Sequence, residues 1–259
     1  RKLGDIEFIG KIISTGSITA LPPPDNKKPN SFSLIKRAEL LSIINPEGLS
    51  SNNPIYDDFI TKMHRREQHF RAWRHEPLKS WQRYPEEAHD YAFDVPEPWL
   101  GFLSALETKF KEKPNGVNIW TWLGHVANPT GGFHCLAWGI DLSNVSAVAG
   151  TRFHAYLQIH DRDGSLYVRC NVGENENAEA KDKNFDLNKK REAARDWLLE
   201  RLAPTEWRPT RKSTGKTFAL ASIPFEEWVT AKDGIVDFDA TTEALIERTL
   251  KLKELATSA

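Results

Sequence analysis

The sequence predicts an α+β fold, in which a mostly helical N-terminal half is followed by an antiparallel sheet with packed helices. Up to Pro114 the apolar residues recur at the spacing of helix turns, whereas beyond Gly116 they alternate with polar residues at every second position. Helix and strand patterns do not alternate as βαβ units, so a Rossmann-type nucleotide-binding fold is not expected. Turn-rich stretches divide the chain into an N-terminal segment with a Pro-rich linker (1–32), a helical region (33–114) and an antiparallel α+β domain (115–259).

The composition places the chain among ordinary globular proteins. Its 259 residues include 35 Lys plus Arg and 36 Asp plus Glu, and 39% of them are apolar. No apolar run reaches the roughly 18 residues that a membrane span requires, so no membrane partner is expected. The only cysteines, Cys135 and Cys170, are too few for a disulfide scaffold or a four-thiolate zinc site. Their scarcity favours a reducing compartment, and we expect a cytoplasmic protein.

The helical region contains three predicted helices. The proline-rich run that precedes residue 33 cannot continue a helix, so the first helix is placed after it, over Ser33–Ile44. The second runs from Tyr56 to about His75, and the third covers Trp99–Lys111. Apolar side chains of the second helix fall within an arc of about 140° and predict a stripe that faces the core. The stripe consists of Phe59, Ile60, Met63, Phe70 and Trp73.

Two-residue alternation predicts the strands of the antiparallel domain. In order, we expect strands over Val117–Leu123 and Phe133–Ile140, a hairpin over residues 152–172, a helix from Asp186 to Leu202, strands over Glu206–Pro209 and Thr217–Ile223, and a closing helix capped by Asp239. Trp120, Trp122 and Trp138 cluster around the first strands. We interpret these rings as core packing rather than as a pocket for a flipped base or a small ligand.

The hairpin is the most sharply patterned segment. Its strands are Arg152–His160 and Leu166–Val172, and Asp163-Gly164 is predicted to form a two-residue turn between them. That turn sets Ile159 opposite Val168, and it carries Cys170 to the apolar side of the pair. The polar residues of both strands are then expected on the other side.

A cationic and aromatic segment between residues 62 and 84 is the strongest functional feature. Guanidinium and ammonium groups suit phosphate contacts, and exposed aromatic rings can stack on unpaired bases. The residues predicted to bind nucleic acid are Lys62, Arg65, Arg66, Arg71, Trp73, Arg74, Lys79 and Arg83. A solvated helix face that packs through its Arg stems is the alternative, because the cations are spread around the helix and Trp73 already belongs to the apolar stripe.

A metal-dependent nuclease is a further alternative. It would use Asp161 or Asp163 with Glu179 to hold Mg²⁺ and Lys181 to orient the attacking water. Glu179 lies in a polar loop without a strand pattern, so this hypothesis ranks below nucleic-acid binding, and the catalytic residues stay unknown.

Other chemistry finds little support in the sequence. Residues 214–217 end like a phosphate-binding loop, but Thr210 stands where the first glycine belongs and a strand follows. The histidines that lie on helices do not share a helix face, and His125 would converge with His134-Cys135 only if their strands are neighbours. Both cysteines fall in apolar strands, where a thiol is inert. We therefore expect no cofactor and no metal.

The last two-fifths of the chain carries a resemblance. It consists of the hairpin, a charged helix over Phe185–Leu202, Glu206-Trp207 at the start of a strand, and the segment from Pro224 to Trp228 before the last helix. This order resembles an uncharacterised bacterial domain that accompanies restriction-endonuclease-like nuclease modules. The resemblance implies a setting in prokaryotic DNA defence or DNA processing, and it carries no catalytic residue over to this chain.

Together these observations predict a protein that binds nucleic acid, DNA or RNA, or supports a partner nuclease, without a complete catalytic site of its own. A non-enzymatic protein-interaction module with a Trp-rich docking surface is the alternative.

Overall fold

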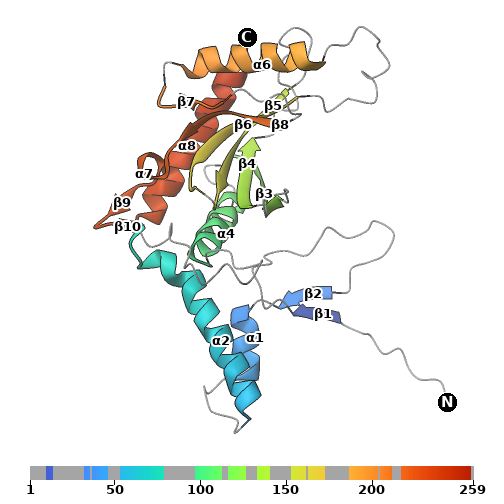
Figure 1. Cartoon of the computed structure of the whole chain (residues 1–259), viewed down its shortest axis with the longest axis vertical. Helices are drawn as coiled ribbons and strands as arrows, with labels where there is room; N and C mark the ends of the chain where they lie inside the picture. The colour runs from blue at the N-terminus through green and yellow to red at the C-terminus, as the bar shows by residue number, and fades with distance from the viewer. Residues whose placement is uncertain are drawn as a thin grey trace, which may run out of the picture. The chain divides into compact units, whose positions relative to one another are not determined.

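The computed structural model describes residues 10–13, 32–35, 37–45, 53–78, 97–112, 116–126, 133–140, 153–161, 163–172, 187–203, 205–211 and 217–257. The chain separates into two compact units, Arg1–Ala72 and Trp73–Ala259, called unit 1 and unit 2 below (Figure 1). An antiparallel six-stranded sheet together with helices confirms the α+β class. No helix of the described ranges is long and apolar enough to cross a membrane.

The described residues of unit 1 form a short parallel strand pair and two helices. The strands are β1 (Gly10–Ile13) and β2 (Phe32–Ile35), and the helices are α1 (Arg37–Ile44) and α2 (Pro54–Arg71). The prediction that a helix begins at Ser33 was therefore wrong. Residues 32–35 pair with residues 10–13, a distant partner that local periodicity cannot reveal, and tertiary pairing overrides local preference here.

The start of α2 is fixed by a side-chain cap. The Asn53 side-chain oxygen accepts hydrogen bonds from the backbone N–H groups of Ile55 and Tyr56, and Pro54 occupies the first helical turn. A small cluster joins the two helices through Leu40, Leu41, Ile60 and Met63. The predicted stripe was wrong at one position, because the Phe59 side chain is 41% exposed.

Unit 2 is organised by the sheet, whose strand order is β3-β4-β5-β6-β8-β7 and whose neighbouring strands are all antiparallel. The strands are β3 (Ile119–Val126), β4 (Phe133–Ile140), β5 (Phe153–His160), β6 (Leu166–Val172), β7 (Arg208–Pro209) and β8 (Thr217–Ile223). The bounds of β4, β6 and β8 are the ones predicted from the sequence.

The hairpin formed by β5 and β6 has a different register from the predicted one. Ile159 lies opposite Leu166 and Leu157 lies opposite Val168, a shift of two residues. The connection has the predicted ends, His160 and Leu166, but the pairing is centred one position earlier than a turn at Asp163-Gly164 requires. The backbone N–H of Gly164, at φ 66°, donates to the His160 carbonyl inside this loop. A shift of two preserves the alternation, so Cys170 still lies in the core as predicted.

Four helices of the described residues belong to unit 2: α4 (Glu97–Lys111), α6 (Leu187–Leu202), α7 (Phe225–Trp228) and α8 (Phe238–Thr257). The 3₁₀ turn η1 (Ala72–Arg74) leads into this unit, and the short strands β9 (Ala231–Lys232) and β10 (Ile235–Val236) pair as a hairpin that precedes α8. Figure 1 shows α8 running along the sheet, where it contacts β4 and β5.

One face of the sheet, called the first face, builds the main core with these helices. Its residues alternate along the strands and include Leu136, Trp138, Ala155, Leu157, Ile159, Leu166, Val168 and Cys170. The Trp138 indole N–H donates to the Thr249 hydroxyl of α8 at 2.9 Å, and the Trp138 ring packs on Phe110 of α4. Aromatic rings of α4 and α7 contact one another and extend this core; they belong to Trp99, Phe102, Phe225 and Trp228.

Candidate nucleic-acid interface

The predicted cationic segment is divided by the boundary between the units. Lys62, Arg65, Arg66 and Arg71 lie on α2 in unit 1, whereas Trp73 and Arg74 belong to η1 in unit 2. Lys79 and Arg83 lie outside the described residues. The predicted cationic segment therefore does not form a single surface among the described residues.

Carboxylates of the same helix pair with some of these cations. The Lys62 ammonium lies 2.8 Å from Asp58, and the Arg71 guanidinium lies 2.8 Å from Glu67, both as exposed i,i+4 pairs. Exposed pairs of this kind contribute only about 0.3–0.5 kcal/mol, so they leave the cations accessible to a stronger anion. Arg65 is exposed.

Trp73 does not present its ring to solvent. Only 6% of it is exposed, and the ring contacts Phe102 at 5.7 Å and Phe238 at 5.1 Å between centroids. The Arg74 guanidinium lies 5.2 Å from the centroid of the same ring. Packing therefore occupies the one aromatic residue of the predicted set.

The nuclease candidates are engaged with other groups. Asp161 is buried, and its carboxylate accepts the backbone N–H of His134 and lies 3.5 Å from the His134 ring. Asp163 accepts the Tyr167 hydroxyl at 2.6 Å. Glu179 and Lys181 lie outside the described residues.

A metal site is not assembled in the part of the chain that the structure describes. His125 on β3 and His134 on β4 are register partners. The two strands are therefore neighbours, which was the condition for these histidines to come together. No group of three His, Cys, Asp or Glu residues among the described residues gathers closely enough to hold a metal ion.

The opposite side of the sheet, called the second face, carries a set of planar and polar side chains that the sequence did not single out. Register places them together, because each alternates with a first-face residue. The second face consists of Trp120, Trp122, Phe133, Cys135, His154, Tyr156, Gln158, His160, Tyr167, Arg169 and Asn171. Most of these side chains are half-buried.

Two tryptophans lie against glycine backbone on this face. A Cβ atom at Gly139 would come within 3.1 Å of the Trp120 ring nitrogen, and one at Gly124 would come within 2.6 Å of the Trp122 ring. Both indoles therefore rest on backbone that carries no side chain. Trp122 is 46% exposed.

The other rings form two groups. Trp120 lies 5.2 Å from His154 and 5.6 Å from Tyr156 between centroids. The His160 ring lies between Phe133, at 4.2 Å, and Tyr167, at 4.5 Å and nearly parallel. Contacts of this geometry hold the rings in fixed orientations.

Gln158 links Cys135 and His160 in the middle of the face and determines the tautomer of His160. Its amide nitrogen donates to the Cys135 sulfur at 2.8 Å, and its oxygen lies 3.1 Å from His160 Nε2. The oxygen can only accept, so the neutral imidazole carries its proton on Nε2. Burial lowers the pKa of His160 to about 4 and raises the pKa of Cys135 to about 12. At neutral pH both groups are uncharged, and the inertness predicted for the Cys135 thiol agrees with this raised pKa.

Some polar atoms of the second face have no hydrogen-bond partner. Among the described residues these include the donors Trp120 Nε1 and Arg169 Nε and the acceptor Asn171 Oδ1, each buried. Leaving a buried polar atom unpaired costs about 1–3 kcal/mol, so unpaired atoms gathered on one face call for an explanation.

The sequence contained both halves of this signal. The alternation of Trp120 and Trp122 with apolar residues was visible, and so was the polar side of the hairpin. The two sets of side chains share one face only because β4 lies between β3 and β5, and periodicity does not reveal the order of strands in a sheet.

Comparison with known proteins adds no relative: no protein-family model, no curated protein and no solved structure matches the chain.

Proposed function

We propose that this protein binds nucleic acid as an unpaired strand, and that the bases stack on the second face of the sheet. The observation that carries the proposal is the exposed Trp122 ring, which lies against Gly124 on the same face as Arg169. Rings on an antiparallel sheet are a common platform for single-stranded RNA.

The chemistry of a nucleotide matches this face in two ways. A base offers a planar surface to Trp122, worth about 1–3 kcal/mol per stacked base. The phosphate between two bases offers an anion to Arg169, whose guanidinium binds such oxygens in a planar fork.

The size of the face suits a short strand. Trp120 on β3 and Arg169 on β6 are separated by three inter-strand steps, or about 14 Å at the usual strand spacing. An arrangement of that width accommodates two or three bases on comparable sheets. Double-stranded nucleic acid would keep its base faces hidden from Trp122, which favours an unpaired strand.

The cations of α2 are the competing phosphate-binding surface, and salt dependence separates the two. One phosphate contact through Arg169 gives a slope of log affinity against log salt of about −0.7 for a single strand. Contacts through Lys62, Arg65, Arg66 and Arg71 together give a slope of about −3.

The deciding experiment compares Trp122→Ala with Phe59→Ala in fluorescence-anisotropy titrations of labelled oligo(dT), oligo(rU) and a duplex. Phe59 is a matched control, since it is an aromatic residue of similar exposure on α2. We expect Trp122→Ala to weaken single-strand binding at least about tenfold, the loss of roughly one stacked base. Phe59→Ala should bind like the unaltered protein, and both variants should keep its melting temperature.

Equal affinities for the Trp122→Ala variant and the unaltered protein would refute the sheet as the binding site. A selective loss with Phe59→Ala, together with a steep salt slope, would instead assign binding to α2.

A protein-interaction module is a second candidate, favoured by a specific observation in unit 1. Large apolar side chains stand exposed on its helices, Ile55 at 81% and Ile43 at 57%. Ile55 and Phe59 lie four residues apart and so share one face of α2. If Ile55→Glu abolishes a stoichiometric co-purifying protein while no oligonucleotide binds, this function replaces the first.

The biological setting in prokaryotic DNA defence or DNA processing, including support of a partner nuclease, is part of the same proposal. It is supported by the resemblance of residues 153–255 and by the chemistry of the second face.

A further inference from the structure

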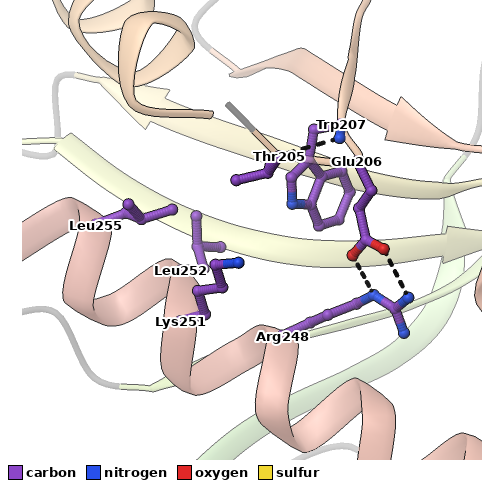
Figure 2. A pocket seen from close by; sticks show the side chains of 7 residues that line it. All are labelled: Thr205, Glu206, Trp207, Arg248, Lys251, Leu252 and Leu255. Carbon is purple, nitrogen blue, oxygen red and sulfur yellow. Dashed lines mark hydrogen bonds and ion pairs between the residues drawn. The ribbon is translucent and has the colours of Figure 1, made fainter. Parts of the chain in front are cut away.

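A pocket lies in unit 2 between the C-terminal half of α8 and the segment that precedes β7, with a volume of about 170 Å³ (Figure 2). Arg248, Lys251, Leu252 and Leu255 line it from the helix, and Thr205, Glu206 and Trp207 line it from the opposing segment. None of these residues belongs to the second face.

The pocket has a fixed ion pair at one side. The Arg248 guanidinium donates two hydrogen bonds to the Glu206 carboxylate, from Nε to Oε1 at 2.7 Å and from Nη2 to Oε2 at 3.1 Å. This bond from Arg248 lowers the pKa of Glu206, so the carboxylate stays ionised at neutral pH. The arginine fork is thus already occupied, and Glu206 balances its charge.

Lys251 supplies a positive charge that this pair does not balance. It is exposed and makes no ion pair with any described residue, although Glu206 lies close enough to interact with it electrostatically. Figure 2 shows its side chain rising from α8 toward the Trp207 ring. Within the lining, two cations face one carboxylate, which leaves a net charge of +1.

Beside the charged residues and Thr205, the lining is apolar and firmly anchored. Trp207 and Leu252 are buried, and Leu255 continues the apolar wall. The Thr205 hydroxyl donates to the Leu202 carbonyl and accepts the Trp207 backbone N–H, so the opposing segment is tied to the end of α6. A ligand would meet a preformed wall rather than a flexible loop.

We infer that this pocket binds a small organic carboxylate whose compact apolar body lies between Trp207 and Leu252 and whose charged group meets Lys251. The volume sets the size of the body, because a dry cavity of about 150 Å³ holds one benzene ring. A ligand of that size binds with a dissociation constant on the order of 1 mM.

Benzoate and benzamide test the inference as a matched pair, since they differ in charge and hardly in shape. Indole N–H signals of the full-length protein are followed by NMR during titration to about 10 mM of each, well above the expected dissociation constant. The Trp207 signal is assigned with Trp207→Phe. We expect benzoate to shift it saturably, and benzamide to bind at least about fivefold more weakly.

Two variants locate the charge that is responsible. Lys251→Gln should weaken benzoate binding at least about fivefold, while Lys232→Gln, which alters an exposed lysine of the β9–β10 hairpin, should leave it unchanged. Equal shifts with benzoate and benzamide, no saturation, or full binding by Lys251→Gln would overturn the inference. None of these results bears on base stacking at Trp122, which is tested separately with oligonucleotides.

Discussion

The two faces of the sheet are built from the same strands and differ in almost every property. On β4, Leu136 and Trp138 are fully buried against helices, whereas Cys135, between them in sequence, lies on the other side beside Gln158. The first face is apolar and is packed against α4, α6, α7 and α8. The second is joined by ring contacts and hydrogen bonds, and it retains unpaired polar atoms. The contrast assigns the apolar packing that stabilises unit 2 to the first face, and the proposed function assigns binding to the second.

The largest expected effect breaks the first face. Phe102→Ala removes a fully buried ring that contacts Trp73, Trp99 and Trp228. The cavity left behind should cost about 3–5 kcal/mol of the free energy of unfolding. Urea denaturation followed by circular dichroism measures this loss, and a loss below about 1 kcal/mol would mean that the core is not packed as described.

A smaller effect belongs to the second face and depends on pH. The unfolded chain binds a proton at His160 near pH 6.5, whereas the folded chain does so only near pH 4. Between these values the unfolded state holds more protons, so stability falls as pH falls through this window. From pH 7 to pH 4.5 the loss from His160 is about 2 kcal/mol.

His160→Gln isolates that contribution. Urea unfolding at both pH values should show a loss about 2 kcal/mol smaller in the variant than in the unaltered protein. Parallel losses in the two proteins would show that His160 is not held neutral between Phe133 and Tyr167.

The smallest effect alters a single hydrogen bond of the first face. Thr249→Val keeps the side-chain shape but removes the hydroxyl that accepts the Trp138 N–H. A buried indole N–H without a partner should cost about 1–2 kcal/mol in thermal or urea unfolding. No change in stability would imply that another group accepts this N–H once the hydroxyl is gone.

The sequence predicted the elements of unit 2 well, because alternation along a strand is a local property. It assigned Cys170 to the core and gave the bounds of β8 correctly. The hairpin register failed by two residues because a two-residue turn was assumed at Asp163-Gly164. The strand at residues 32–35 was missed because its partner is more than twenty residues away.

The candidate sites were less accessible to prediction. The sequence grouped Trp120, Trp122 and Trp138 around the first strands. In the structure Trp138 lies in the core, whereas Trp120 lies against Gly139 and Trp122 against Gly124. Alternation along the strands places Trp138 on one face of the sheet and Trp120 and Trp122 on the other. Only the strand order shows which polar residues of β5 and β6 lie beside Trp120 and Trp122 on the second face. The pocket at Trp207 depends on α8 returning to the end of α6, which local patterns do not encode.

The placement of Trp73 determines where the chain can be divided. This residue is the first of unit 2 and follows α2 with only Ala72 between them, yet its ring contacts both Phe102 and Phe238. A protease that cleaves after Arg74, or a shortened gene that starts there, would remove an indole from the interior and leave a hole beside two phenyl rings. Separate production of the C-terminal unit therefore has to begin at Ala72 or earlier.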